Sequence, residues 1–404
     1  MKIAVIGLGH VGAVTAVCLA NAGHEVIAID ADPAVMSAIG RGLPPVIEPG
    51  LAEVFAATVA SGRLRAGTYG TLAEEAPQLV IVCVGTPGAA DGSLDASQVV
   101  DAARQLAEAL GDGRDAVAVV FRSTLMPGTM DDRISPLFAT LDHVSLGYNP
   151  EFLREGSAIA DFLHPSRIVI AGAEEARRLL RSLYAFIGAP VFETSFRVAE
   201  TVKLVDNTFH ALKVSFANEI GRFASVAGID SAQLFEIFLA DRQLNISPRY
   251  LTPGLSFGGP CLPKDVAALS AALAQAGIAA PLVGGVLNSN AEHRRFLVRR
   301  VGAMVPKEAR AILLGLGFKS GTADVRGSVV VELVDLLLAE GRDIDIFDLE
   351  LSAEALRSLP PRVRGRLLTA PPSAEGGWQV VLAGREVDVP AALAGLPVLR
   401  MDLL

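Results

Sequence analysis

The stretch FGGPCLPKD, residues 257–265, combines the residue types in this chain that are best suited to covalent chemistry. Cys261 follows two glycines, has a proline within two residues on each side, and precedes Lys264 and Asp265. The glycines leave room for a substrate to approach the sulfur, and a neighbouring lysine and helix start favour the nucleophilic thiolate. A structural thiol in a tight turn is the alternative interpretation.

The other two cysteines and the composition limit the class of protein. Cys18 and Cys83 lie in apolar runs, where a buried and inert thiol is expected. Three cysteines make no disulfide framework and suit a reducing compartment, so we predict a cytoplasmic protein. The net charge of −9 argues against a nucleic-acid partner. We also expect no membrane partner and no metal site.

A second group of polar residues is spaced for one face of a helix. The stretch 196–227 contains no proline, and no glycine interrupts it before Gly221. Lys203 and Asn207 are four residues apart and His210 follows Lys203 by seven, so the three share one face of the predicted helix. A solvated polar stripe explains this spacing equally well.

The N-terminus carries a dinucleotide fingerprint. Gly7, Gly9 and Gly12 form GxGxxG between a buried strand and a helix, and Asp30 ends the next strand eighteen residues after Gly12. The first glycine permits a tight turn, the second lets a pyrophosphate approach the backbone, and the third allows close helix packing. Because a carboxylate accepts bonds from a ribose diol and repels a 2′-phosphate, the pattern favours NAD over NADP. This spacing also explains the apolar start better than a signal peptide does.

Further strands are predicted at 78–85, 115–121, 143–148 and 166–172, with a helix at 97–110 between two of them. Alternating strands and helices predict a parallel, doubly wound sheet. Ligands of such sheets bind beyond the carboxyl ends of the strands. The residues predicted to line this rim, near the nicotinamide, are Thr86, Ser123, Thr124, Glu151 and Glu155.

The second half of the chain predicts another sheet. After a helix at about 230–240 and a loop to Asp265, a helix resumes; from about 305 the apolar runs again alternate with helical patterns. The fold class is therefore α/β, with two Rossmann-like doubly wound domains joined by a long central helix and a helical middle domain. We place the domains at 1–190, 191–300 and 301–404. Lys319 and Arg326 follow the first strand of the last domain and suit phosphate groups.

These motifs resemble the UDP-glucose/GDP-mannose dehydrogenase family along nearly the whole chain. GLGHVG, CVGTP, RSTLMPGT, NPEFLREG, the stretch 199–221, FGGPCLPKD and GLGFKSGTADVR occur in the family's order and spacing. The resemblance implies oxidation of the C6 alcohol of a nucleotide sugar to a carboxylate with two NAD+. It also implies that Cys261 holds the aldehyde as a thiohemiacetal and then as a thioester.

The resemblance implies roles for other residues as well. Lys203 and Asn207 match a pair that steadies the developing oxyanion, and Glu151 and Asp265 match groups that handle water and protons. For Asp265, helix capping is an equally good explanation. The predicted cofactor contacts are Gly7, Gly9, His10, Val11, Gly12, Asp30, Thr86, Ser123, Thr124, Glu155, Lys264 and Arg326. The predicted substrate contacts are Glu151, Phe152, Leu153, Lys203, Asn207, His210, Asn245, Arg249, Tyr250, Phe257, Gly258 and Lys319. Thr124 is expected at the reaction centre too.

The loop before the cysteine bears on the substrate. Members that oxidise UDP-glucose usually carry an arginine sixteen residues before the nucleophile, whereas this chain has Asn245. The loop looks more like that of members that oxidise GDP-mannose for polysaccharide biosynthesis, in which it reaches the substrate of the partner subunit. We therefore predict GDP-mannose as substrate and a homodimer whose active site the partner completes. His10 and Pro260 depart from the family's usual tyrosine and serine.

Three other functions share parts of this sequence pattern. A UDP-glucose or UDP-hexosamine 6-dehydrogenase keeps the mechanism and changes the nucleotide pocket. A β-hydroxyacid dehydrogenase shares the first module but needs neither Cys261 nor a second Rossmann-like domain. A non-catalytic NAD-binding sensor is expected to lose Cys261, Lys203 or Asp265, all of which are present.

Overall fold

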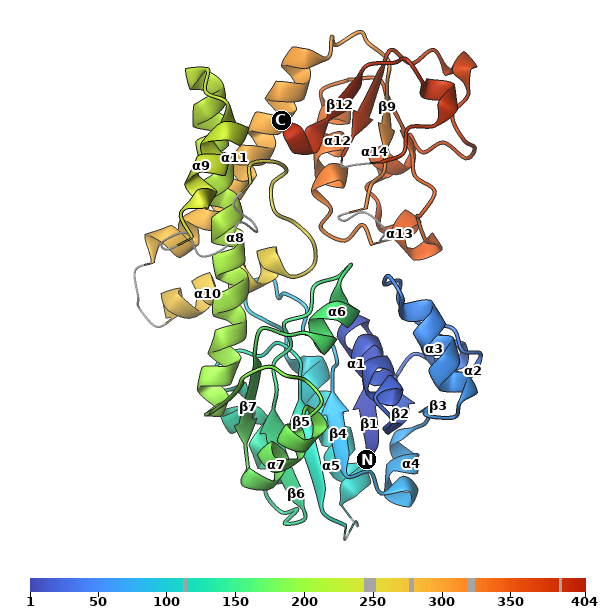
Figure 1. Cartoon of the computed structure of the whole chain (residues 1–404), viewed down its shortest axis with the longest axis vertical. Coiled ribbons are helices and arrows are strands. Elements are labelled where there is room, and N and C mark those ends of the chain that lie inside the picture. The colour runs from blue at the N-terminus through green and yellow to red at the C-terminus, as the bar shows by residue number, and fades with distance from the viewer. Residues whose placement is uncertain (112, 114, 243–251, 276–279, 318–323, 385–386) are drawn as a thin grey trace. The chain divides into compact units, whose positions relative to one another are not determined.

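The computed structural model describes the chain except for residues 112, 114, 243–251, 276–279, 318–323 and 385–386. Its contacts divide the chain into two compact units, Met1–Val205 and Asp206–Leu404 (Figure 1). This division does not test the three-domain boundaries at 190 and 300, which stay a prediction. Within the described ranges no helix is long and apolar enough to cross a membrane.

Unit 1 is built on a sheet with the strand order β3-β2-β1-β4-β5-β6-β7-β8. Its strands are β1 (Lys2–Ile6), β2 (Glu25–Ile29), β3 (Leu64–Ala66), β4 (Leu79–Val82), β5 (Val117–Phe121), β6 (Val144–Tyr148), β7 (Ile168–Gly172) and β8 (Val191–Thr194). Its helices include α1 (His10–Asn21), α2 (Pro33–Gly40), α3 (Leu51–Ala60), α4 (Tyr69–Glu75), α5 (Ser97–Leu110), α6 (Ala158–Leu163) and α7 (Glu174–Leu183). The predicted α/β fold with a Rossmann-like first sheet is confirmed.

Both faces of this sheet are covered by helices. Along β1, Ile3 and Val5 pack into one apolar cluster with α1 and α3, whereas Ala4 and Ile6 pack into another with α5. Strands buried on both faces become continuous apolar runs, which is why these strands were visible in the sequence.

One strand pair corrects the prediction of a parallel sheet. β6 and β7 run antiparallel, with Gly147 opposite Gly172 and Tyr148 opposite Ala171. The connection at 149–167 contains only the short helix α6, so β7 starts near the edge where β6 ends. Glycines suit this pairing, because a Cβ at Gly172 would overlap the Leu146 carbonyl.

The long predicted helix is α8 (Phe196–Ala227), which begins in unit 1 and ends in unit 2. Unit 2 continues with α9 (Ser231–Ala240), α10 (Leu262–Gln275) and α11 (Pro281–Met304). The sequence predicted that a helix resumes after Asp265, but α10 starts three residues before it, at Leu262. α11 was not predicted.

The C-terminal part of unit 2 is a parallel sheet with the order β10-β9-β11-β12. Its elements are β9 (Ala311–Leu314), α12 (Val329–Ala339), β10 (Ile344–Phe347), α13 (Ala353–Ser358), α14 (Pro361–Arg364), β11 (Val380–Ala383) and β12 (Val398–Arg400). The turn after β9 repeats the turn after β1: Gly7 has φ +84° and Gly315 φ +77°. In each turn an aspartate accepts the N–H of the residue after the glycine at 2.6 Å: Asp30 bonds Leu8, and Asp348 bonds Leu316. The second Rossmann-like sheet predicted from the sequence is thus present.

The two later glycines of the fingerprint are predicted to respond differently to substitution. A Cβ at Gly12 would overlap the carbonyl of Gly7 and approach Cys83, whereas a Cβ at Gly9 would meet nothing within 4 Å. We expect Gly12→Ala to lower the free energy of unfolding by about 3 kcal/mol, because the backbone oxygen cannot give way. Gly9→Ala, where φ is −62°, is the matched control and should change it by less than about 0.5 kcal/mol. Urea unfolding measures both, and equal effects would contradict the packing role of Gly12.

Candidate active site

The glycine loop leads into a helix start that can accept an anion. Gly7 N–H bonds the Ile29 carbonyl at 2.8 Å, which closes the turn after β1. Gly9 is the N-cap of α1 and supplies no side-chain cap. The first N–H groups of α1 therefore face an open approach at Gly9, where a phosphate group fits.

Asp30 is fixed at the end of β2 by backbone groups. Its carboxylate accepts the N–H of Leu8 at 2.6 Å and that of Asp32 at 2.9 Å. A carboxylate offers about four acceptor sites. The two that remain can receive the hydroxyls of a ribose.

Two hydroxyls tie together the segments that leave β4 and β5. Thr86 donates to the Thr124 carbonyl at 2.9 Å, and Ser123 donates to the Val84 carbonyl at 2.7 Å. The predicted rim residues Thr86, Ser123 and Thr124 are thus brought together and buried. The hydroxyl hydrogens of Thr86 and Ser123 are already used in these two bonds. Toward a ligand, their oxygens can therefore only accept hydrogen bonds.

Glu48 joins the glycine loop to the segment that carries Glu151 and Glu155. Its carboxylate lies 2.9 Å from His10 Nε2 and accepts the N–H groups of Gly156 and Ala158, each at 2.8 Å. Burial opposes ionisation, but the close contact with His10 and the bonds from the two N–H groups outweigh it and hold the pKa of Glu48 below its usual value. Sequence reasoning missed this residue; a single acid within the apolar stretch PPVIEPGL was its only trace.

A buried ion pair joins Lys203 of α8 to Glu151. The Lys203 Nζ lies 2.9 Å from the Glu151 carboxylate, which also accepts the Leu153 N–H at 2.6 Å. The ring of Phe152 lies 5.8 Å from the same ammonium. Burial raises the pKa of Glu151, but Lys203 and the Leu153 N–H bring it below the usual range, so the carboxylate is ionised at neutral pH.

A buried arginine fixes the two segments that carry Thr124 and Glu151. Arg122, next to Ser123, donates to the Asn149 side chain and to the Tyr184 hydroxyl, the latter at 2.8 Å. Tyr184 in turn donates to Asn149 at 2.7 Å. The ends of β5 and β6 are therefore held in one hydrogen-bond network that sequence patterns did not indicate.

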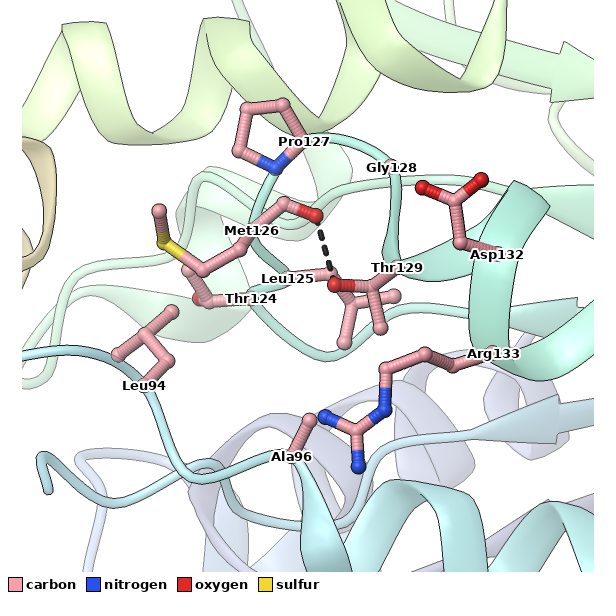
Figure 2. Close-up of a pocket in the computed structure, with 10 residues that line it drawn as sticks. All are labelled: Leu94, Ala96, Thr124, Leu125, Met126, Pro127, Gly128, Thr129, Asp132 and Arg133. Carbon is pink, nitrogen blue, oxygen red and sulfur yellow. Dashed lines mark hydrogen bonds between the residues drawn. The ribbon is translucent and has the colours of Figure 1, made fainter. Parts of the chain in front are cut away.

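A pocket of about 230 Å³ lies next to the Thr124 segment (Figure 2). It is lined by Leu94, Ala96, Thr124, Leu125, Met126, Pro127, Gly128, Thr129, Asp132 and Arg133. The buried Glu200 of α8 holds this loop in place, accepting Gly128 N–H at 2.6 Å and Met130 N–H at 2.8 Å. Neither the pocket nor Glu200 was predicted, although Thr124 was.

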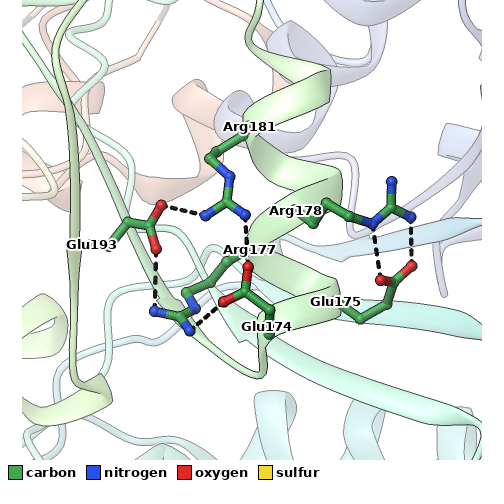
Figure 3. A network of polar contacts seen from close by, with 6 residues as sticks. All are labelled: Glu174, Glu175, Arg177, Arg178, Arg181 and Glu193. Atoms are coloured by element: carbon green, nitrogen blue, oxygen red, sulfur yellow. Dashed lines mark hydrogen bonds and ion pairs between the residues drawn. The ribbon is translucent and has the colours of Figure 1, made fainter.

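A charged network on α7 and β8 lies among exposed side chains and forms no comparable site (Figure 3). Glu193 of the edge strand β8 pairs with Arg177 and Arg181, which also pair with Glu174. Exposed pairs contribute little individually, and their effect here is to fasten an edge strand to its neighbouring helix.

In unit 2 the thiol lies at a helix start. Cys261 directly precedes α10 and is exposed, whereas Cys18 and Cys83 are buried. Asp265 in the first turn is fully buried; its carboxylate accepts from Asn207 and, at 2.9 Å, from Lys264. These contacts fix the Asp265 carboxylate at the start of α10. Lys264, predicted to contact the cofactor, here bonds this carboxylate.

The glycines before the thiol allow close backbone packing. Gly259 N–H bonds the Gly327 carbonyl at 2.8 Å, and a Cβ at Gly258 would overlap the same oxygen. Phe257 is buried in an apolar cluster. Arg326, another predicted cofactor contact, is exposed and pairs with Asp324 at 2.6 Å.

The structure thus gathers the predicted residues into two groups. Unit 1 holds the glycine loop with His10 and Val11, Asp30, the rim threonines and serine, Glu151, Phe152, Leu153, Glu155 and Lys203. Unit 2 holds Asn207 and the half-buried His210 on α8, Phe257, Gly258, Cys261, Lys264, Asp265 and Arg326. Asn245, Arg249, Tyr250 and Lys319 lie outside the described residues.

The contribution of Lys203 to the free energy of unfolding is predicted to depend on the negative charge of Glu151. Lys203→Met should lower the free energy of unfolding by about 3–5 kcal/mol, because it leaves a buried carboxylate without this cation. The double variant Lys203→Met/Glu151→Gln should lose much less, because it removes the buried charge. Since protonation neutralises Glu151, the loss in Lys203→Met should shrink as the pH falls through the carboxyl range. Urea unfolding at several pH values checks this; equal losses in the single and double variants would contradict it.

Comparisons with known proteins agree over most of the chain. Residues 1–187 match the model of the UDP-glucose/GDP-mannose dehydrogenase family, NAD binding domain, and residues 197–292 match that family's central domain. The GDP-mannose 6-dehydrogenase of Azotobacter vinelandii is 42% identical, over 86% of this chain and 81% of its own length.

Solved structures give the same result. A UDP-glucose dehydrogenase from Pyrobaculum islandicum superimposes with a TM-score of 0.86 at 34% identity, covering 95% of this chain and 89% of that one. A GDP-mannose dehydrogenase from Pseudomonas aeruginosa superimposes with a TM-score of 0.60 at 33% identity, covering 99% and 96%. The chain belongs to the UDP-glucose/GDP-mannose dehydrogenase family.

Proposed function

We propose that this NAD-dependent nucleotide-sugar 6-dehydrogenase converts GDP-mannose to GDP-mannuronate and retains the intermediates on Cys261. The observation that carries the proposal is the exposed thiol at the start of α10, one turn before the buried Asp265 with its partners Asn207 and Lys264. A thiol near a fixed carboxylate suits covalent chemistry on sulfur, because the carboxylate can move the protons of each step.

The cofactor site fits NAD. The open approach at Gly9 and the α1 start suit the pyrophosphate, and the free acceptor sites of Asp30 suit a ribose diol. Bound NAD+ supplies the acceptor for each hydride that leaves C6. Asp32, which caps α2 beside Asp30, adds a second negative charge that disfavours a 2′-phosphate.

Cys261 is the thiol that can react. Burial raises the pKa of Cys18 and Cys83 to about 12, so neither forms a thiolate near neutral pH. After the alcohol loses its first hydride and a proton, the Cys261 thiol adds across the aldehyde C=O bond, sulfur to carbon and proton to oxygen, and gives a thiohemiacetal. Loss of a second hydride and a proton gives a thioester, and water then cleaves the carbon–sulfur bond to release the carboxylate and the thiol.

Other residues prepare these steps. We assign Lys203 and Asn207, one turn apart on α8, to the negative charge that develops on the substrate oxygen. Glu151 is ionised and Asp265 is held by two donors, and we assign them to the movement of protons from the alcohol and from water. Thr124 and Glu155 are assigned to the nicotinamide end, and Lys264 and Arg326 to cofactor binding.

The identity of the sugar nucleotide rests on similarity. The GDP-mannose 6-dehydrogenase of A. vinelandii at 42% identity favours GDP-mannose. The P. islandicum structure, a UDP-glucose dehydrogenase, makes UDP-glucose the second candidate. The substrate-contact residues Asn245, Arg249, Tyr250 and Lys319, which bear on this choice, are assigned from the sequence alone.

We further propose a homodimer whose active site the partner completes. Apolar side chains on α8, α9 and the turn between them support an interface: Phe209, Phe216, Ile229 and Ile237 are exposed. A second copy of this chain would cover them. Such an enzyme would act in the cytoplasm, and its acidic product would serve polysaccharide biosynthesis.

The proposal predicts the behaviour of Cys261→Ser. Given GDP-mannose and excess NAD+, this variant should release no free uronate, because a serine hydroxyl adds poorly to the aldehyde and an oxygen ester resists hydrolysis more than a thioester does. Chromatography of the products measures this, with Cys18→Ala as the matched control that retains turnover. Release of uronate by Cys261→Ser at the rate of the unmodified protein would exclude the thioester route.

A further inference from the structure

The residues immediately before the nucleophile have no strand neighbour. Residues 253–258 belong to no helix or strand. Buried backbone N–H and C=O groups need partners, and in a sheet the adjacent strand supplies them. Here buried side chains of α8 and α11 take that place.

Asn290 of α11 pairs with both backbone groups of Phe257. Its Oδ1 accepts the Phe257 N–H at 2.8 Å, and its Nδ2 donates to the Phe257 carbonyl at 2.8 Å. This is the two-bond pattern by which a residue is held in an antiparallel ladder. Asn290 is only 3% exposed, so water does not compete for these bonds.

Two further side chains hold the segment three residues earlier. Asn218 of α8 accepts the Gly254 N–H at 2.9 Å and donates to the Leu255 carbonyl at 3.3 Å. His293 of α11 lies 2.6 Å from the Gly254 carbonyl through Nε2, while its Nδ1 lies 3.0 Å from Arg222. Because arginine only donates, Nδ1 accepts and Nε2 carries the hydrogen that bonds Gly254. Burial lowers the pKa of His293 to about 4, so the ring is neutral and can fill both roles.

The chain is also held just after this segment, at Gly259 and Cys261. Gly259 N–H bonds the Gly327 carbonyl, and the Cys261 carbonyl accepts the Asp265 N–H at 3.1 Å as α10 begins. The Phe257 ring packs with Ala211, Val266 and Val286. The apolar contacts keep the segment attached, while the Asn290 bonds set its position along the helices.

We propose that Asn290 is a positioning residue for the Cys261 thiol, acting through the backbone of Phe257 four residues earlier. The inference rests on the proposed role of Cys261 as nucleophile. Without Asn290 the segment can slide or rotate about the anchored Phe257 ring. A displacement of about 1 Å at a reacting atom costs up to about 100-fold in rate.

The test compares Asn290→Ala with Asn288→Ala. Asn288 is an exposed amide two residues earlier on the same helix, so its loss controls for the substitution itself. We expect Asn290→Ala to lower kcat about 10- to 100-fold and to slow alkylation of Cys261 by iodoacetamide. The Kd for NAD+ should change much less than kcat, because the glycine loop and Asp30, which are assigned to the pyrophosphate and a ribose, lie in unit 1. Asn288→Ala should match the unmodified protein in kcat, in the rate of Cys261 alkylation and in the Kd for NAD+.

The outcomes separate this inference from the proposed function. A folded Asn290→Ala with unchanged kcat and alkylation would overturn the positioning role alone. Uronate release by Cys261→Ser would instead overturn the proposed function. Should Asn290→Ala fail to fold, Asn290→Asp replaces it: the carboxylate still accepts the Phe257 N–H but cannot donate to the carbonyl. It is expected to show an intermediate loss, and full activity would overturn the proposal.

Discussion

The segments that carry the chemistry of this protein are irregular, and the constraint on them is that each buried backbone N–H needs an acceptor. Side chains supply these acceptors at one segment after another. Each of four side chains accepts backbone N–H groups: Asp30 that of Leu8, Glu48 those of Gly156 and Ala158, Glu200 those of Gly128 and Met130, and Asn290 that of Phe257. The sheets provide the frame, but these side chains determine where the loops lie. The predicted active-site residues therefore depend on partners that take no part in the reaction.

The same bonding pattern has different electrostatic results at different positions. Glu48 and Glu200 each accept two backbone N–H groups, yet the pKa of Glu48 is lowered and that of Glu200 is raised. Burial is the largest influence on both. Glu48 has His10 in direct contact, whereas at Glu200 the negative charge of Asp131 adds to the effect of burial, and the pKa rises. Glu151, with Lys203 at 2.9 Å, behaves like Glu48, which suits a group that must be ionised to take up a proton.

Much of the fold could be predicted because its determinants are local. α8 spans Phe196–Ala227 as predicted, since a helical pattern without proline ends at Gly228. β8 was missed because VFET is mostly exposed and gives no apolar run, and α11 because its first turns contain two glycines and two asparagines. The antiparallel pairing of β7 depends on how the 149–167 connection runs, which no local pattern shows. Glu48, Glu200 and Asn290 were missed for a related reason: their partners are backbone atoms 33 to 110 residues away. Cys261 was visible from its neighbours and the rim residues from the sheet pattern, but the catalytic roles came from family motifs and stay predictions.

The most direct measurement of the central claim is the amount of NADH formed per sugar nucleotide when the sugar nucleotide is limiting. GDP-mannose, UDP-glucose and UDP-N-acetylglucosamine are supplied separately with excess NAD+. The account predicts two NADH per GDP-mannose and little from the other two, because the aldehyde stays on Cys261 until the second hydride has left. Two NADH from a UDP-sugar alone would keep the mechanism and contradict the substrate. One NADH per GDP-mannose with free aldehyde in solution would contradict the covalent mechanism itself.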